Sequence, residues 1–245
     1  MRTVIVSGGG TGIGRATAHA FARSGDDVHI LGRREDVLAE TASSINEDVG
    51  REVVHPHSAD LTQIAAIEAI RSQLPGEVDV LVNNAGGAHG GADDSLAEFE
   101  RYVRAGFEAN FLPAALLTHA LLDRMRRPGG RIVNVSSIAA LRGGGVAYAS
   151  AKAAILGLTY SLASELGPDG ITVNAVAPGY IPDTEFFGDS MTPERHERLV
   201  AQTLTGRPGT PDDVAAAIVY LASPEAGQVT AQILQVNGGA LPGHG

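Results

Sequence analysis

The alternation of strand-like and helix-like segments along the whole chain constrains its fold most strongly. Runs rich in β-branched residues occur at 3–6, 28–31, 52–57, 78–82, 131–135, 171–176 and 232–236, with helix-like segments between them. Several of these strands are continuous apolar runs, which is typical of a parallel sheet covered by helices on both faces. Right-handed crossovers between such strands predict a doubly wound α/β domain.

The alternation continues without a linker, an internal repeat or a low-complexity tract. With 245 residues, of which 44% are hydrophobic, the chain has enough apolar material for one full core. We therefore expect a single domain over residues 1–245. The long irregular stretch from Pro178 to Met191 is interpreted as a functional loop, and with the helix after it forms a predicted substrate lid over 178–205.

Composition excludes several classes of protein. The net charge of -10 disfavours a nucleic-acid partner, which needs a basic face, and the absence of cysteine favours a reducing compartment. The chain enters an apolar strand directly after Met1 and Arg2, and its longest apolar run, 214–222, is too short to span a membrane. We expect a soluble cytoplasmic protein with no membrane partner. His55 and His57 alternate on one strand, but no third ligand is evident, so no metal site is predicted.

A glycine-rich turn joins the first strand to the first helix. The segment from Ser7 to Gly14 reads S-G-G-G-T-G-I-G, so that Gly8, Gly12 and Gly14 follow the pattern G-x-x-x-G-x-G. Glycines allow the backbone to turn tightly and approach a pyrophosphate, which the helix N-terminus then stabilises. A tight turn with surplus glycine is the alternative. In its position between strand and helix, we interpret the segment as a dinucleotide site.

The end of the second strand indicates which dinucleotide. Gly32 is followed by Arg33 and Arg34, where an NAD site favours an acidic side chain for the ribose hydroxyls. Arginine suits bidentate contact with a phosphate. NADP(H) is therefore favoured over NAD(H), with Arg33 as the partner of the 2′-phosphate. Two solvated arginines at the start of a helix are the alternative.

A tyrosine and a lysine lie one helical turn apart. Tyr148 and Lys152 are at i and i+4, and Lys152 is the only lysine among the 18 lysine and arginine residues. A nearby ammonium favours phenolate and lowers the pKa of a phenol, which suits Tyr148 to general acid–base chemistry. Ser136 and Ser137 follow the strand 131–135, at the edge where open α/β sheets bind ligands.

Taken together, these motifs resemble those of the short-chain dehydrogenase/reductase family, in its compact single-domain branch with a Rossmann-type fold. The resemblance covers essentially the whole chain, at residues 7–14, Asp60-Leu61, Asn83-Asn84-Ala85-Gly86, Asn110, Ser137, Tyr148, Lys152 and Pro178-Gly179. It implies an oxidoreductase that transfers hydride between a nicotinamide and a carbonyl or secondary alcohol, with reductases of 3-oxoacyl thioesters as the enzymes it resembles. It also implies a homotetramer built as a dimer of dimers.

The resemblance also implies a catalytic set. Tyr148 exchanges the proton of the carbonyl oxygen, and Lys152 lowers the pKa of Tyr148 and binds the nicotinamide ribose. Ser137 polarises the substrate carbonyl, and Asn110 supports Lys152 through a water-linked path. Ser137 precedes Tyr148 by 11 residues, about two fewer than usual in the family, so the substrate pocket beside 142–145 is expected to differ.

The expected cofactor-binding residues come from the same resemblance. Asp60 holds the adenine, Asn83 stiffens the sheet beneath the cofactor, and Thr184 meets the carboxamide. The full set is Gly8, Thr11, Gly12, Ile13, Gly14, Arg33, Asp60, Leu61, Asn83, Ala85, Gly86, Tyr148, Lys152, Pro178, Gly179, Ile181 and Thr184.

Two questions stay open at this point. A non-catalytic NAD(P)-binding sensor or scaffold on the same fold is the alternative function, although a binder needs no proton-transfer groups. Arg124, Arg126 and Arg127 form a basic cluster that either completes a helix C-terminus or docks an acidic acyl carrier protein or a phosphate-bearing thioester.

Overall fold

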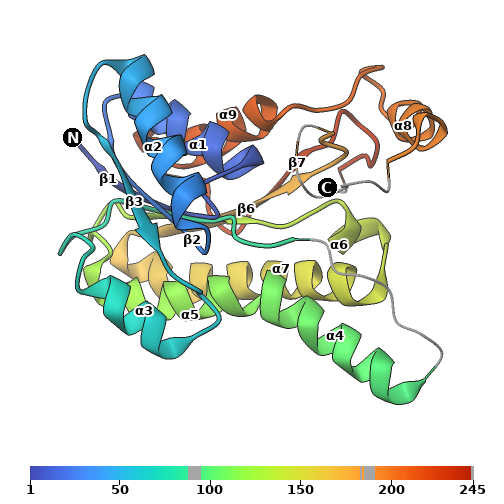
Figure 1. The fold of residues 1–245 in the computed structure, drawn as a ribbon, viewed down its shortest axis with the longest axis horizontal. Coiled ribbons are helices and arrows are strands. Elements are labelled where there is room, and N and C mark those ends of the chain that lie inside the picture. The colour runs from blue at the N-terminus through green and yellow to red at the C-terminus, as the bar shows by residue number, and fades with distance from the viewer. Residues whose placement is uncertain (88–94, 183, 185–190, 244–245) are drawn as a thin grey trace.

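The computed structural model describes all residues except 88–94, 183, 185–190 and 244–245, and contains one seven-stranded parallel sheet (Figure 1). The strands are β1 (Thr3–Ser7), β2 (Asp27–Gly32), β3 (Val54–Ser58), β4 (Val80–Asn83), β5 (Arg131–Val135), β6 (Thr172–Pro178) and β7 (Ile233–Val236). The helices are α1 (Gly12–Arg23), α2 (Glu35–Val49), α3 (Ile64–Arg71), α4 (Leu96–Asn110), α5 (Leu112–Leu121), α6 (Ala139–Arg142), α7 (Val146–Leu166), α8 (Pro193–Val200) and α9 (Pro211–Leu221). The predicted doubly wound α/β fold is confirmed.

The order of the strands creates the ligand-binding edge. The sheet runs β3-β2-β1-β4-β5-β6-β7, and β1 pairs in parallel with both β2 and β4. The chain therefore builds outward from β1 in one direction and then returns to build in the other. Open α/β sheets bind ligands in the crevice outside the carboxyl ends of the strands at such a switch point, which here are β1 and β4.

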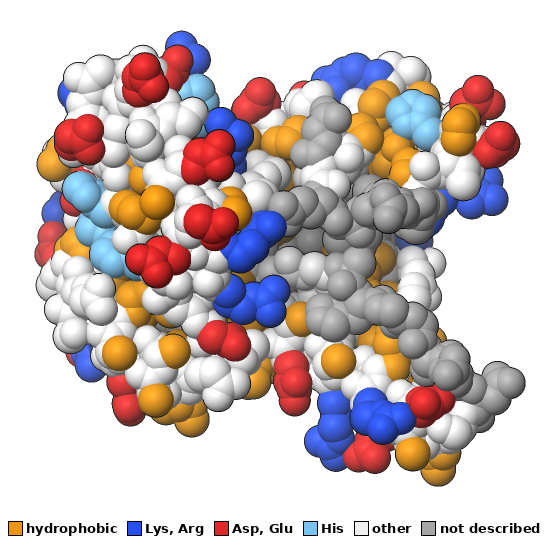
Figure 2. Space-filling model, viewed as in Figure 1, with side chains coloured by type: hydrophobic (Ala, Val, Ile, Leu, Met, Phe, Trp, Pro, Cys, Tyr) orange, Lys and Arg blue, Asp and Glu red, His pale blue; other side chains and the backbone are white. Residues whose placement is uncertain are grey.

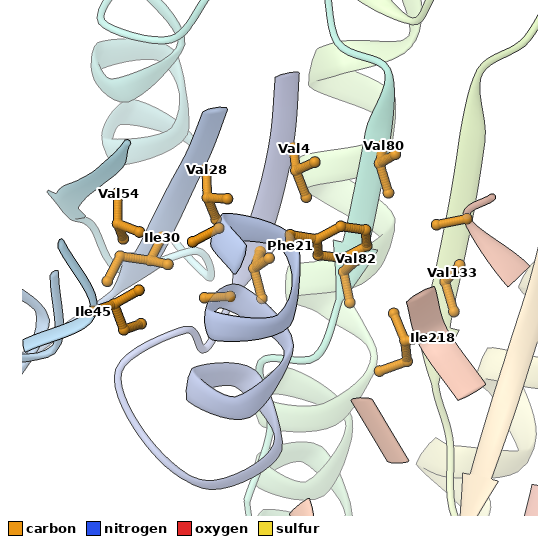
Figure 3. Close-up of a cluster of buried hydrophobic side chains, with 14 of the residues drawn as sticks. Val4, Phe21, Val28, Ile30, Ile45, Val54, Val80, Val82, Val133 and Ile218 are labelled. Carbon is orange, nitrogen blue, oxygen red and sulfur yellow. The ribbon is translucent and has the colours of Figure 1, made fainter. Parts of the chain in front are cut away.

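Two apolar layers hold the helices on the sheet. One cluster includes Val4, Phe21, Val82 and Ile218 and lies between the sheet and helices α1, α2 and α9 (Figure 3). The other includes Leu81, Leu121 and Ile132 and lies under the helices of the opposite face. Figure 1 shows the two helical layers on either side of the sheet. Burial on both faces explains why the strands are continuous apolar runs.

Proline and glycine mark helix boundaries on both sides of β5. The helical stretch between β4 and β5 is divided at Phe111 into α4 and α5, and Pro113 lies in the first turn of α5. After β5, the short helix α6 precedes α7, which begins at Val146. The glycines that follow Arg142 separate these two helices.

Helix α7 also qualifies the expectation about membranes. Among the described residues, it is the one helix that is long and apolar enough to cross a membrane by length and composition. Its buried side packs on the sheet and includes Ile155, Thr159 and Lys152. A helix of this kind is typical of the core of an α/β domain, so its apolar character is explained by packing.

Candidate active site

The turn between β1 and α1 is packed too tightly for side chains at its glycine positions. Gly8 has a φ of +66° and donates its N–H to the carbonyl of Leu31 at 2.7 Å. A Cβ at Gly14 would lie 2.0 Å from the carbonyl oxygen of Gly8. Thr11 precedes α1 without capping it through its side chain, and the first turn of the helix contains no acid. The first-turn N–H groups, among them those of Ile13 and Gly14, therefore fit an anionic pyrophosphate.

Ser7 and Asn84 join this turn to the end of β4. The Ser7 hydroxyl accepts hydrogen bonds from the backbone N–H groups of Asn84 and Ala85 at 3.0 and 3.1 Å. The Asn84 side chain donates to the carbonyls of Ser7 and Gly8, both at 3.1 Å. The Ser7 hydroxyl therefore fixes the end of β4 against the glycine turn. Asn84 lies in the matching segment 83–86, but no role was predicted for its side chain.

The segment after β6 lies against the same turn. Gly179 packs so closely on Asn237 that a Cβ would lie 2.7 Å from the Asn237 Cβ. Ile181 is buried, and its carbonyl accepts from the Thr184 hydroxyl at 3.1 Å. A Cβ at Gly12 would lie 3.1 Å from the Thr184 methyl group. The fold thus brings Pro178, at the end of β6, and the residues after it next to the glycine turn. Residues 183 and 185–190 of the predicted lid lie outside the described residues.

Tyr148 and Ser137 lie together at the carboxyl end of β5. Burial raises the pKa of Tyr148 above its ordinary value, and a side-chain hydrogen bond with Ser137 opposes that rise. The net direction is opposite to the lowering that the sequence argument expected from Lys152. The reason is that the phenol is desolvated, while the Lys152 Nζ lies 5.9 Å from the ring centroid. At neutral pH Tyr148 therefore carries its proton.

Lys152 is buried and held by backbone. Only 4% of its surface is exposed, and its Nζ donates to the carbonyl of Val135 at 3.0 Å. Burial lowers its pKa to about 8, which is the desolvation effect expected for a buried ammonium. The group is still mostly protonated at neutral pH. A charged ammonium thus lies one helical turn from a protonated phenol.

Asn110 and Gly86 lie directly beside Lys152. Asn110 ends α4, is 1% exposed, and exchanges hydrogen bonds with the backbone N–H and carbonyl of Gly87, both at 3.0 Å. A Cβ at Gly86 would lie 2.7 Å from the Asn110 side-chain oxygen and 3.2 Å from the Lys152 Nζ. Asn110 and Lys152 are therefore neighbours across the Gly86 backbone, and each is bonded to main chain.

A buried polar chain crosses the sheet beneath this site. The Asn83 side chain donates to Thr118 and to Asn134, each at 2.8 Å, and Asn134 donates to Thr159 of α7 at 2.9 Å. Asn83 thus ties β4 to both β5 and α5. Asn134 and Thr159 were missed, although a polar residue inside an apolar strand and another inside an apolar helix were visible signals.

The other end of the crevice is open to solvent. Arg33 is exposed at the end of β2, and its charge helps to lower the pKa of Asp60. The first cause of that lowering is Thr62, whose backbone N–H and hydroxyl donate to Asp60 at 3.0 and 2.8 Å. Leu61 is buried in the core. The sequence-predicted adenosine residues are thus near one another.

The basic cluster after α5 is engaged within the fold. Arg124 donates to the carbonyls of Arg71, Leu74 and Pro75. The other two arginines form ion pairs, Arg126 with Glu77 and Asp79, and Arg127 with Asp169. This favours the structural interpretation over a docking surface for an acidic carrier. On the face in Figure 2, acidic and basic side chains are interspersed.

Three histidines form a cluster on β2 and β3. His29 hydrogen-bonds His57 at 2.9 Å, and Asp27 contacts His55 at 2.8 Å and His29 at 3.3 Å. Burial lowers the pKa of His57 to about 4 and also lowers that of His29. Among the residues that the structure describes, no group of histidines and acids has the arrangement of a metal site.

Comparisons with known proteins extend over the full length of the chain. A family model described as enoyl-(acyl carrier protein) reductase matches residues 8–240. A 3-oxoacyl-(acyl-carrier-protein) reductase of Rickettsia prowazekii is 34% identical and covers 98% of this chain and 97% of its own. Subunit BbsD of a hydroxy(phenyl)methylsuccinyl-CoA dehydrogenase of Thauera aromatica is 37% identical, with 97% and 96% covered.

A solved structure agrees with these relatives. An actinorhodin polyketide ketoreductase variant, crystallised with NADPH, superimposes with a TM-score of 0.86 at 33% identity, over 98% of this chain and 97% of that one. The similarity therefore includes the sheet, both helical layers and the crevice, and is not confined to the glycine-rich turn.

Proposed function

The chain belongs to the short-chain dehydrogenase/reductase family of NAD(P)-dependent oxidoreductases that act on CH–OH and C=O groups, and we propose that it reduces a ketone with NADPH. The favoured substrate class is a 3-oxoacyl thioester. The observation that carries the proposal is the group of buried Ser137, half-buried Tyr148 and buried Lys152 at the carboxyl end of β5.

In this proposal Tyr148 is the proton donor to the carbonyl oxygen. Its pKa is raised by burial, so the phenol holds its proton at neutral pH until charge develops on the substrate oxygen. Ser137 hydrogen-bonds the same phenol and orients the carbonyl. When bound, the nicotinamide supplies the hydride, and the protein supplies positioning and the proton.

Lys152 and Asn110 support this proton transfer from Tyr148. The Lys152 ammonium, with a pKa of about 8, is charged at neutral pH and stabilises the phenolate left after proton transfer. In the proposal it also binds the nicotinamide ribose. Asn110 exchanges hydrogen bonds of 3.0 Å with the Gly87 backbone and so fixes the backbone beside Lys152. In the proposal, Asn110 supports Lys152 through a water-linked path that resupplies the proton.

The cofactor residues are proposed as one continuous site. Thr11, Ile13 and the three glycines of the turn receive the pyrophosphate. Asn83, Ala85 and Gly86 line the ribose. The nicotinamide meets Pro178, Gly179, Ile181 and Thr184. Asp60 and Leu61 receive the adenine. Arg33 binds the 2′-phosphate, which makes NADP(H) the preferred cofactor, and the NADPH of the similar ketoreductase supports this preference.

The substrate class is supported by the names of the relatives. One is a reductase of acyl-carrier thioesters, one is part of a CoA-thioester dehydrogenase, and one is a polyketide ketoreductase. A non-catalytic sensor on the same fold is the alternative. The buried proton-transfer groups favour the enzyme, because burying an ammonium costs free energy that simple nucleotide binding does not require.

We propose a cytoplasmic homotetramer, a dimer of dimers, without a membrane or nucleic-acid partner. The side of α7 that faces away from the sheet exposes Ala153, Gly157 and Tyr160, and small residues allow helices to approach closely. Light scattering coupled to gel filtration tests this assembly, and a monomeric mass would refute it.

The test of the activity is the initial rate of reduced-nicotinamide consumption, with NADPH and with NADH, across a panel of ketones. The panel contains a 3-oxoacyl thioester on CoA and on an acyl carrier protein, a cyclic ketone, a diketone and a keto sugar. We expect turnover with NADPH on the thioesters. Tight NADPH binding without turnover of any ketone would favour the sensor instead.

A further inference from the structure

Four consecutive residues at the end of β5 each form a hydrogen bond to α7. These bonds are Asn134 to the Thr159 hydroxyl at 2.9 Å, the Val135 carbonyl to the Lys152 Nζ at 3.0 Å, Ser136 to the Lys152 carbonyl at 2.8 Å, and Ser137 to the Tyr148 phenol. On α7 the partners lie on the side that faces the sheet. Tyr148 and Thr159 lie about three helical turns apart, so the strand end and the helix are joined along that length of α7.

Ser136 is a member of this row to which the proposed chemistry assigns no role. It is 3% exposed, and its hydroxyl donates to the backbone carbonyl of Lys152. Lys152 is therefore held to β5 at both ends, by its Nζ on Val135 and by its carbonyl on Ser136. Because Tyr148 is one turn earlier on the same helix, the position of Lys152 also determines where the phenol meets Ser137.

We propose that Ser136 is a positioning residue for the reaction, which fixes the depth of α7 against β5 and thereby the proton affinity of Tyr148. The inference rests on the proposed function, because it concerns the proton donor of that reaction. Its physical basis is the hydrogen bond between Ser137 and Tyr148, which lowers the pKa of the phenol. That bond depends on the distance between the strand end and the helix.

The segment before α7 is restrained unevenly. Gly143 has a φ of +88° and no neighbour within 4 Å of a Cβ placed on it, whereas a Cβ on Gly145 would lie 3.0 Å from the Tyr102 hydroxyl of α4. On the opposite side, Ala147 packs on Gly106 of α4, where a Cβ on the glycine would lie 2.6 Å from the Ala147 Cβ. This contact limits the movement of α7 toward α4. The hydrogen bond from Ser136 limits the movement of α7 away from β5.

The test replaces Ser136 with alanine and, separately, with cysteine. Ser136→Ala removes the donor, and Ser136→Cys keeps the volume while leaving only a weak donor, so a fold defect in one does not end the test. In both we expect the midpoint of Tyr148 ionisation to rise by about half a pH unit or more, because the Ser137 bond weakens. We expect kcat for the ketone to fall about tenfold with KM for NADPH within about twofold.

Two readouts follow the ionisation. One is the pH profile of kcat/KM, and the other is the NMR signal of ring-labelled Tyr148, assigned by its loss in Tyr148→Phe. The protein has only five tyrosines, which makes the assignment practical. Ser24→Ala is the matched control, because Ser24 also donates to a helix carbonyl, that of Ala20 at 3.0 Å, but is exposed and far from the site. It should change neither readout.

An unchanged Tyr148 midpoint in both Ser136 variants would overturn the inference, even if thermal stability and kcat fell, because a purely structural role predicts that result. The NMR titration needs no substrate. If the wild-type protein reduced no ketone, the proposed function would fail, while the titration would still decide whether Ser136 controls the phenol.

Discussion

The two ends of the proposed cofactor site are built on different principles. At the nicotinamide end, Asn110, Ser137 and Lys152 are buried, and Asn110 and Lys152 are bonded to main chain. At the adenosine end, Arg33 is exposed and Asp60 is only partly buried, held by Thr62. The Lys152 ammonium of the first end lies in the core, and the Arg33 guanidinium of the second lies at the surface.

This difference follows from the work each end has to do. Proton transfer requires a defined pKa and a fixed distance, and both are obtained by desolvation and by bonds to rigid backbone. Recognition of a phosphate requires a charged side chain that can reach it, and this works at the surface. Changes at the nicotinamide end should therefore alter rates, whereas changes at the adenosine end should alter cofactor choice.

The largest expected effect is at the nicotinamide end. Tyr148→Phe removes the proposed proton donor but keeps the ring, so kcat/KM should fall by about 10³-fold. Binding of NADPH, followed by fluorescence titration, should change by less than about twofold, and the thermal midpoint should stay near the wild-type value. Near-normal turnover would show that the nicotinamide end does not use this phenol.

A second substitution acts on the turn that both ends share. Gly14→Ala places a Cβ 2.0 Å from the Gly8 carbonyl oxygen and 2.6 Å from the Asn84 side-chain nitrogen, so the backbone must shift. We expect NADPH and NADH to weaken together, by about 100-fold, because the pyrophosphate is common to both. Gly76→Ala is the matched control, since nothing lies within 4 Å of its Cβ. Selective loss of one cofactor would contradict a shared turn.

The adenosine end is tested by Arg33→Ala. Loss of a charge-assisted contact should weaken NADPH by about 10- to 100-fold and leave NADH nearly unchanged. Arg104→Ala is the control for net charge, because Arg104 lies on α4 in an exposed pair with Glu100. Kd values for both cofactors decide the outcome. Equal weakening of NADPH and NADH would mean that Arg33 does not distinguish them.

Much of the fold and of the site's composition could be predicted from sequence, because both depend on local pattern. The apolar strand runs indicated the parallel sheet, and the glycine turn, Tyr148 and Lys152 indicated the crevice. Burial raises the pKa of Tyr148, whereas the sequence predicts a lowering by Lys152, because the burial of the phenol is set by tertiary packing and cannot be seen in a local spacing. The bond from Ser136 to the Lys152 carbonyl joins residues 16 apart across two elements, and no spacing rule anticipates it.

The smallest expected effect concerns the strands beneath the adenosine end. These strands, β2 and β3, hold the histidine cluster, in which burial lowers the pKa of His57 to about 4 and also lowers that of His29. The unfolded chain takes up these protons near pH 6.5 and the folded chain does so only at lower pH, so acid favours unfolding between about pH 6.5 and 4.

Between pH 7 and 5 this should lower the thermal midpoint by about 2 to 4 °C, after allowance for the partial exposure of His57. Calorimetry of His57→Gln should reveal a smaller dependence on pH, because one of the shifted groups is gone while Asp27, His29 and His55 remain. His19→Gln is the control, since His19 pairs with Asp48 away from the cluster. If His57→Gln and the wild type lost stability equally as the pH fell, the cluster would not be the acid-sensitive part of the adenosine end.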